Sequence, residues 1–104
     1  MRFRTLVLAL AMAAVTGSSH AACYELIGCT DSDHFQRRDL RQLSCQALWE
    51  VRNQIYSENG YCFRTQRAIN LFGNDGCYTR NPDLSPIEEA NVAAISAVEA
   101  RKGC

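Results

Sequence analysis

The sequence has little histidine and no closely spaced cysteine pair, and both features restrict its chemistry. Histidine occurs only at His20 and His34. A single histidine in a polar segment does not readily form an acid–base pair or a Cys–His pair. No C-x-x-C motif occurs, which disfavours zinc, and Asp31 and Asp33 lack the remaining ligand positions of a calcium loop. We therefore expect no enzymatic activity, no metal and no cofactor.

The chain also lacks an excess of charge of one sign. It has 11 basic and 11 acidic residues, and removal of Arg2 and Arg4 with a leader leaves 9 basic against 11 acidic, a net charge of −2. Such a balance carries no electrostatic signature of nucleic-acid or anionic-membrane binding. After the leader, no apolar run is long enough to span a bilayer. We expect no nucleic-acid partner and no stable membrane anchor after leader cleavage.

Residues 1–21 have the pattern of a secretory signal peptide. Arg2 and Arg4 precede a short apolar run at residues 6–15, and small residues stand three and one places before a cut after Ala21. The run is about half the roughly 20 residues that a membrane-spanning helix needs. The sequence predicts an exported protein, periplasmic or secreted, and the simple leader favours a bacterial source.

A lipoprotein signal acting on Cys23 is the alternative for the leader. Such signals carry a Leu-like residue three places before the modified cysteine, where this chain has His20. Lipidation of Cys23 would also leave an odd number of cysteines. We therefore favour a cleaved leader without lipidation.

All six cysteines follow the leader. The remaining chain of about 83 residues is too short to depend on a large core, and exported domains of this size are commonly held by disulfides. Three disulfides and 15 connectivities are possible. The cysteines are Cys23, Cys29, Cys45, Cys62, Cys77 and Cys104.

Helical spacing and capping residues predict three helices. The first begins around Asp39, or at Ser44, and ends at Asn59-Gly60; the second, short helix runs from Thr65 to Phe72. The third follows the capping sequence at residues 85–88 and runs to about Lys102. The apolar face of the third helix comprises Ile87, Ala90, Ala94, Ile95 and Val98.

These elements predict an all-α fold, a small three-helix domain held by disulfides. A short extended turn at residues 61–63 joins the first two helices. We divide the chain into a signal peptide at 1–21, an irregular N-terminal arm with the lead-in to the first helix at 22–42, and the domain proper at 43–104.

Helix length limits the cysteine pairing. Cys45 and Cys62 lie at opposite ends of the first helix, roughly 20 Å apart, whereas a disulfide needs Cα atoms within about 7 Å. If the third helix packs antiparallel to the first, Cys104 approaches Cys45. Cys62 and Cys77 flank the short helix, which leaves Cys23 with Cys29. Other connectivities remain open.

The segment from residue 48 to residue 77 contains an ordered series of motifs: Leu48-Trp49, Arg52-Asn53, Ile55-Tyr56, Gly60-Tyr61-Cys62-Phe63, Arg67-Ala68-Ile69, Phe72-Gly73-Asn74 and Gly76-Cys77. With these motifs the segment resembles the YARHG domain, in the cysteine-containing form of exported bacterial proteins. The resemblance covers about residues 43–104, and it implies an extracytoplasmic module of unknown molecular function with no active site. The five-residue motif that gives the family its name is changed in this chain. The corresponding residues, Tyr56-Ser57-Glu58-Asn59-Gly60, keep only its Tyr and Gly.

Aromatic and arginine side chains form a candidate binding surface. The rings offer a rigid contact surface for a sugar or a peptide, and Arg52 can clamp a carboxylate. For each of these residues we favour a structural role instead. In that role the rings pack around the first helix, and the arginines other than Arg52, together with Arg80, lie on a solvated face. The surface comprises Trp49, Arg52, Tyr56, Tyr61, Arg64 and Arg67.

Two functions fit these features. We expect a monomeric, non-enzymatic binding module of the bacterial cell envelope, whose ligand is peptidoglycan, another glycan or an envelope protein. The alternative is a small secreted inhibitor or effector that docks on a partner protein through the loop of residues 73–84.

Overall fold

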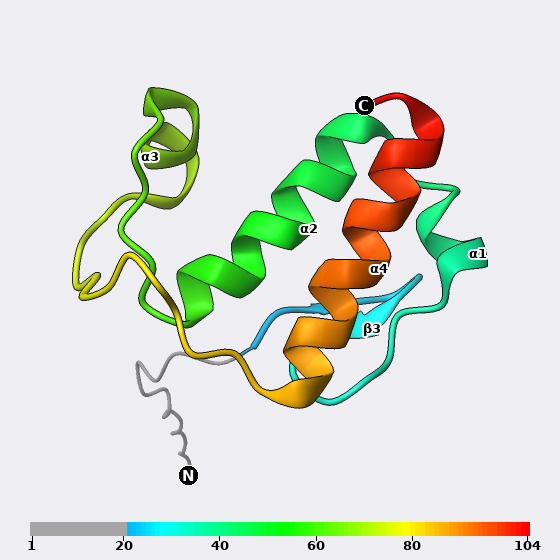
Figure 1. The fold of residues 1–104 in the computed structure, drawn as a ribbon, viewed down its shortest axis with the longest axis horizontal. Coiled ribbons are helices and arrows are strands. Elements are labelled where there is room, and N and C mark those ends of the chain that lie inside the picture. The colour runs from blue at the N-terminus through cyan, green and yellow to red at the C-terminus, as the bar shows by residue number, and fades with distance from the viewer. Residues whose placement is uncertain (1–20) are drawn as a thin grey trace, which may run out of the picture.

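Two antiparallel helices form the frame of the protein. The computed structural model describes residues 21–104, so residues 1–20 of the expected leader lie outside the described part. Helix α2 (Cys45–Glu58) and helix α4 (Pro86–Lys102) lie side by side (Figure 1). Helix α3 (Gln66–Phe72) lies on one side of this pair, and the single-turn helix α1 (Arg37–Leu40) lies on the other.

Local capping determines where the two long helices begin. The Ser44 hydroxyl accepts a hydrogen bond from the Ala47 amide, 3.1 Å away, and so satisfies a free donor of α2. At α4, Ser85 and Glu88 form a reciprocal capping box. Of the two predicted starts of the first helix, Ser44 is the correct one. The prediction of three helices is wrong, because residues 37–40 form a separate helical turn before the chain bends.

The hydrophobic core lies between α1, α2 and α4. Its fully buried side chains include Leu40, Leu48, Ile55 and Ile95. The predicted inner face of the third helix is partly wrong, because Ala90 is exposed. The buried face of α4 instead includes the polar residues Glu88 and Asn91.

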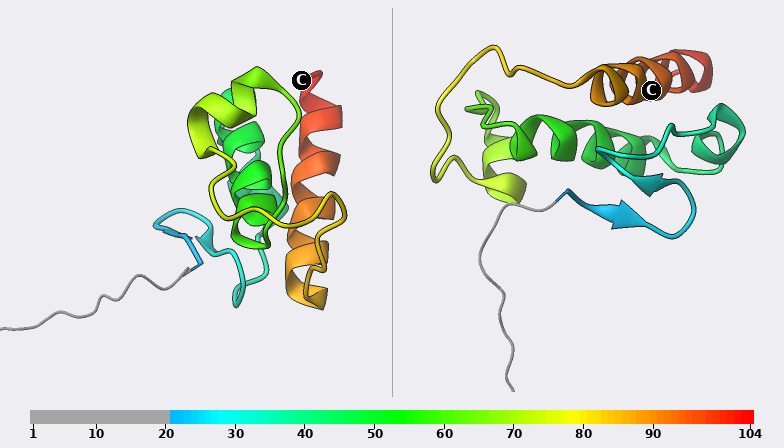
Figure 2. Two further views of the ribbon diagram at one scale, coloured as in Figure 1. Left: turned by 90° about the vertical axis from the view of Figure 1, so that its left-hand side faces the viewer. Right: turned by 90° about the horizontal axis from the view of Figure 1, so that it is seen from below.

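The N-terminal arm begins with a β-hairpin and ends with the single turn of α1, so it is not irregular throughout. Strands β2 (Cys23–Tyr24) and β3 (Gly28–Cys29) pair antiparallel. The turn needs a positive φ at Gly28, which is +104°, a conformation that side-chain-bearing residues rarely adopt. In Figure 2 the hairpin lies on the opposite side of α2 from α4. The fold is therefore mainly helical with a two-stranded sheet, and the all-α assignment needs this correction.

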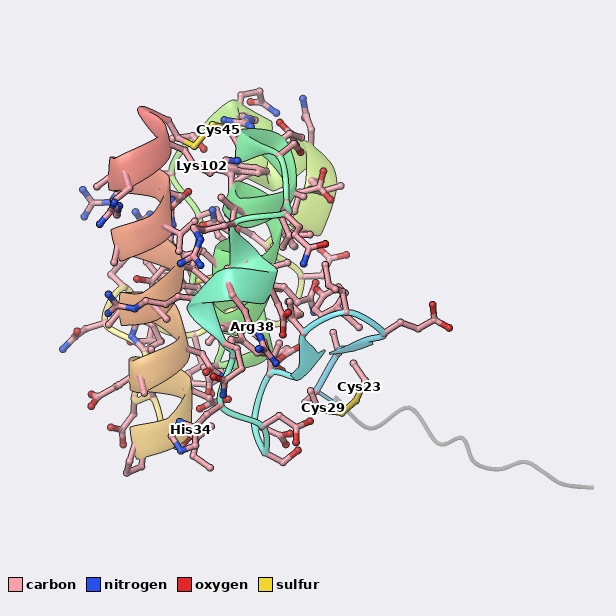
Figure 3. All side chains as sticks on the ribbon, turned by 90° about the vertical axis from the view of Figure 1, so that its right-hand side faces the viewer. Cys23, Cys29, His34, Arg38, Cys45 and Lys102 are labelled. Carbon is pink, nitrogen blue, oxygen red and sulfur yellow. A yellow bond between two sulfur atoms is a disulfide. The ribbon has the colours of Figure 1, made fainter. Side chains whose placement is uncertain are left out.

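Three disulfides connect the elements. Cys45–Cys104 joins the start of α2 to the second residue after the end of α4, Cys62–Cys77 closes a loop around α3, and Cys23–Cys29 crosses the hairpin. These are the pairs favoured by the helix-length argument. Figure 3 shows Cys45 and Lys102 near one end of the molecule and the Cys23–Cys29 bridge in the hairpin.

The extended turn is paired to the loop of residues 73–84. Tyr61 and Thr79 form an isolated parallel bridge, and the Cys62 amide donates to the Thr79 carbonyl at 2.8 Å. The side chain of Asn74 bonds both the amide and the carbonyl of Phe63, at 2.7 and 3.0 Å. These bonds and the disulfide hold the loop against α2 and α3. Within residues 21–104, no helix has the length and apolarity to cross a membrane.

Candidate functional site: an aromatic and arginine surface on α2

Five aromatic rings form a continuous row along α2. Trp49 lies 6.0 Å from Phe72 between ring centroids, and Phe72 stacks on Phe63 at 5.2 Å. Phe63 meets the Tyr61 ring edge-on at 5.0 Å, and Tyr61 lies 5.8 Å from Tyr56. Such pairs contribute roughly 0.5–1.5 kcal/mol each beyond area burial. The row attaches α3 and the extended turn to α2, which is the structural role expected for these residues.

A guanidinium group covers the outer face of the row at its α3 end. The Arg67 guanidinium carbon lies 3.7 Å from the centre of the Trp49 ring, a cation–π contact. Arg67 also donates a hydrogen bond to the side-chain oxygen of Gln46. Because Arg67 is on α3 and its partners are on α2, these contacts hold an exposed positive charge beside an aromatic ring.

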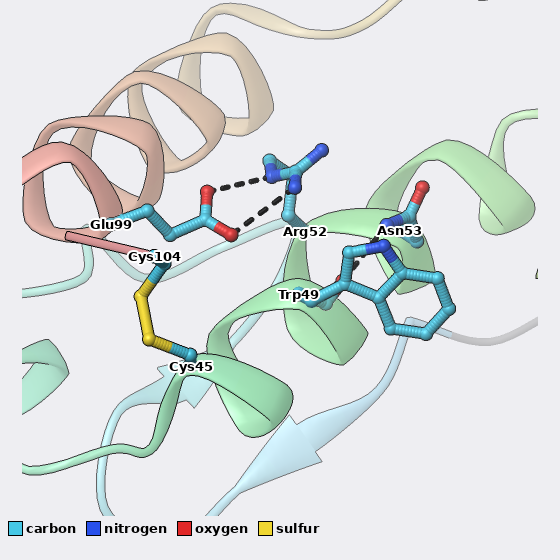
Figure 4. Close-up of polar contacts among 6 residues, drawn as sticks. All are labelled: Cys45, Trp49, Arg52, Asn53, Glu99 and Cys104. Atoms are coloured by element: carbon cyan, nitrogen blue, oxygen red, sulfur yellow. Dashed lines mark hydrogen bonds and ion pairs between the residues drawn. A yellow bond between two sulfur atoms is a disulfide. The ribbon is translucent and has the colours of Figure 1, made fainter.

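A second arginine of the surface pairs with α4. Arg52 donates from Nε and Nη2 to the two carboxylate oxygens of Glu99, at 2.8 and 3.1 Å (Figure 4). A two-pronged bond of this kind fixes the plane of the guanidinium group. The Asn53 amide group donates to the Trp49 carbonyl at 2.9 Å. Asn53 therefore bonds the backbone of its own helix.

Two surface hollows meet at Arg52. The first, of about 530 Å³, contains Trp49, Arg67 and Glu99 together with the Cys45–Cys104 bridge. The second, of about 390 Å³, is lined in part by Tyr56, Tyr61 and Arg80. Arg52 lines both. The arrangement offers the Arg67 cation, which lies over the Trp49 ring, and the Arg52 guanidinium group, whose charge is balanced by Glu99. These groups suit a ligand that has carboxylates and flat or apolar parts.

The structure brings together most of the predicted surface but not all of it. Trp49, Arg52 and Arg67 share the first hollow, and Tyr56 and Tyr61 share the second with Arg52. Arg64 is exposed and lines neither hollow. Sequence reasoning missed Glu99 and Gln46, because neither belongs to a motif and each meets its arginine only through the packing of α4 and α3 on α2.

Neither a free thiol nor a cluster of metal-ligand residues occurs in the described part of the chain. All six cysteines are paired, which leaves no free thiol. Between residues 21 and 104, no three His, Cys, Asp or Glu side chains are grouped as metal ligands. His34 is exposed at the opposite end of the molecule from the Cys45–Cys104 bridge (Figure 3).

Comparison with known proteins identifies the family. The YARHG domain matches residues 23–100, which include the hairpin, all four helices almost completely and every residue of the two hollows except those at the extreme end of the chain. The match includes residues 23–42, so the prediction that the resemblance begins at about residue 43 and leaves out the N-terminal arm is wrong. No curated protein and no solved structure matches the chain significantly. Because the family match covers well over half of the sequence, this chain belongs to the YARHG domain family.

Proposed function

We propose that this chain is an exported, non-enzymatic binding module of the bacterial cell envelope that binds peptidoglycan in the hollow of Trp49, Arg52 and Arg67. The observation that carries the proposal is the Arg67 guanidinium over the Trp49 ring, next to Arg52. The disulfides suit an oxidising compartment. Peptidoglycan combines sugar rings with carboxylate-bearing peptides, so it presents both kinds of group that this hollow can contact.

The positions of the two arginines support an anionic ligand. Glu99 occupies Nε and Nη2 of Arg52, and in Figure 4 the third guanidinium nitrogen points away from Glu99. Arg67 is exposed and makes one side-chain hydrogen bond, to Gln46. Each arginine therefore has guanidinium donors that these bonds do not use and that a carboxylate could accept.

Co-sedimentation with purified sacculi tests this function. Oxidised protein should pellet with the sacculi, whereas reduced protein should remain soluble because the surface depends on the folded state. Arg67→Ala should weaken pelleting, and Arg64→Ala is the matched control, since Arg64 is an exposed arginine outside both hollows. Oxidised protein that stays in the supernatant, or equal loss with both variants, would contradict wall binding through this hollow.

The loop of residues 73–84 supports a second candidate function, an inhibitor or effector that docks on a partner protein. Tyr78 in this loop is 77% exposed, and the loop is held by the Cys62–Cys77 disulfide. A large side chain on a constrained loop binds with little loss of conformational freedom. An envelope pull-down with wild type and Tyr78→Ala tests this role. A partner retained equally by variants at every position of the loop would exclude the loop as its docking site.

A further inference from the structure

The carboxylate of Glu58, at the end of α2, receives three hydrogen bonds. The backbone nitrogen of Ala22 lies 2.7 Å from Oε2 of Glu58. The Thr30 hydroxyl donates to Oε1 at 2.7 Å, and the Gln54 amide group donates to Oε2 at 2.8 Å. Two of these donors come from the N-terminal arm, so Glu58 is the point at which the arm is bonded to the end of α2.

Among residues 21–104, no cationic side chain forms an ion pair with Glu58. The side-chain ion pairs of residues 21–104 are Arg38–Asp39 and Arg52–Glu99. A carboxylate that is partly removed from water is destabilised unless a positive charge or several donors compensate it. Three donors already compensate Glu58. A positive charge at the position of one of them would add a direct attraction to the carboxylate.

The backbone of Ala22 is held on both sides of its Cα atom. Its nitrogen meets Glu58, and its carbonyl accepts a hydrogen bond from the Thr30 amide at 3.0 Å. Thr30 is fully buried, and its own carbonyl accepts from the Asn91 amide group at 3.1 Å. The Cys23–Cys29 disulfide follows immediately in the chain. The Ala22 nitrogen is thus placed against Glu58 by contacts that do not involve residues 1–20.

The sequence pattern places the expected leader cut between Ala21 and Ala22. Hydrolysis of that peptide bond by a signal peptidase adds the hydroxyl of water to the carbonyl carbon of Ala21. Ala21 then carries a carboxylate and leaves with the leader. The Ala22 nitrogen takes up protons and becomes an α-ammonium group. We propose that cleavage after Ala21 creates this α-ammonium group next to Glu58, and that the resulting ion pair completes the docking of the hairpin on α2.

The proposal explains why the position of the cut matters. The bond from a peptide amide to the Glu58 carboxylate is already charge-assisted. An α-ammonium group at this nitrogen adds the attraction between two opposite charges, so it binds Glu58 more tightly than a peptide amide does. A cut one residue later would move the new amine by about 3.8 Å and remove the Ala22 carbonyl that Thr30 holds. The inference rests on the expected export of the chain, and it is independent of what the Trp49 hollow binds.

The test uses the full-length chain with its leader, exported to a bacterial periplasm. N-terminal sequencing and intact mass should show a protein that begins at Ala22 and carries three disulfides. Thermal unfolding is then compared for wild type, for Glu58→Gln, for a chain with one glycine inserted between Ala21 and Ala22, and for the combination. Glu50→Gln is the matched control, because Glu50 is an exposed carboxylate on the same helix.

The ion pair predicts a specific pattern of thermal unfolding midpoints among these variants. Glu58→Gln and the glycine insertion should each lower the midpoint by on the order of 5 °C, the combination should be little worse than either alone, and the control should stay near wild type. The glycine insertion leaves Glu58 intact, so it still tests the ion pair if the Glu58→Gln variant folds poorly. A mature N-terminus other than Ala22, an insertion without effect, or fully additive losses would overturn the proposal.

Discussion

Arg52 and Glu99 join the two long helices at the floor of the first hollow. They lie 47 residues apart in the sequence, and two hydrogen bonds of 2.8 and 3.1 Å connect them. Their side chains are only 26% and 14% exposed, so water screens the pair less than it screens a surface ion pair. Glu99 thereby orients Arg52 toward the ligand position that we propose.

Removal of Glu99 should destabilise the protein. Glu99→Ala leaves a partly buried guanidinium group without its partner, and we expect a loss of about 1–2 kcal/mol in the free energy of unfolding, measured by urea titration. Asp39→Ala is the control, because its pair with Arg38 spans 3.9 Å and Arg38 is 80% exposed. An exposed pair of that length should contribute less than about 0.5 kcal/mol. Equal losses would show that the burial of the Arg52 pair has no energetic consequence.

The three disulfides should differ in their contribution. Cys45–Cys104 spans 59 residues, and Cys23–Cys29 spans six. On the chain-entropy account the longer closure stabilises the fold by roughly 4 kcal/mol and the shorter by roughly 2 kcal/mol. Paired Cys→Ser variants, oxidised and unfolded in guanidinium chloride, should follow this order. The reverse order would mean that local structure of the hairpin outweighs loop closure.

Asn91 should be the most sensitive polar residue of α4. It is 1% exposed; its Oδ1 accepts from the Phe35 amide at 2.9 Å, and its Nδ2 donates to the carbonyls of Thr30 and Asp33 at 3.1 and 2.8 Å. Asn91→Ala leaves these backbone groups without partners and should cost about 3 kcal/mol. Amide hydrogen exchange should show the arm opening first. Asn70→Ala, at an exposed position, serves as control and should change stability little.

Glycine is required at position 60 both by the backbone conformation and by the neighbouring ring of Tyr78. Its φ is +82°, and an added Cβ would lie 2.2 Å from the Tyr78 ring. Gly76 has a similar φ of +76° but open space around it, so Gly76→Ala should cost only the backbone strain of about 1 kcal/mol. Gly60→Ala should cost more by urea unfolding, and Tyr78→Ala in the same chain should remove the excess. If Tyr78→Ala does not reduce the loss of unfolding free energy that Gly60→Ala causes, the steric explanation is wrong.

Tyr24 should make the folded state less stable in alkaline solution. Burial raises the pKa of the Tyr24 phenol above its usual value of 10.0, and the negative charges of Glu58 and Glu50 raise it further. The unfolded chain then loses the phenolic proton at a lower pH than the folded protein does. The stabilisation is therefore complete below pH 10 and is lost as the pH rises toward the folded pKa. Tyr24→Phe should show a shallower decline of the unfolding free energy above pH 10, and an unchanged decline would exclude this cause.

The helices and their caps could be predicted from local residues. Ser44, Thr65 and Ser85 each cap the helix that the sequence suggested, because a cap depends on residues only three positions away. The hairpin was missed because its strands have two residues each and show no alternating pattern. The turn of α1 was merged with the following helix, since apolar spacing alone continues through residue 43.

The residues of the candidate site could be predicted from the sequence, but the side chains that they contact could not. Trp49 and Arg52 stood out because they lie three positions apart on the first predicted helix, and Arg67 because it belongs to a group of arginines around the second. The three line one hollow. Glu99 and Gln46 gave no signal, because each meets its arginine across an interface between helices. Asn91 was missed for the same reason: its three bonds reach segments 56 to 61 residues away.

The sequence by itself determined the family, the positions of the long helices and the short list of disulfide pairs that helix length permits, because these depend on local spacing and on distances along one helix. Only the tertiary structure decided that Glu99 pairs with Arg52, that Asn91 holds the arm and that the Ala22 nitrogen meets Glu58. Those contacts join residues far apart in the chain, and the packing of α4 and the hairpin against α2 sets their geometry.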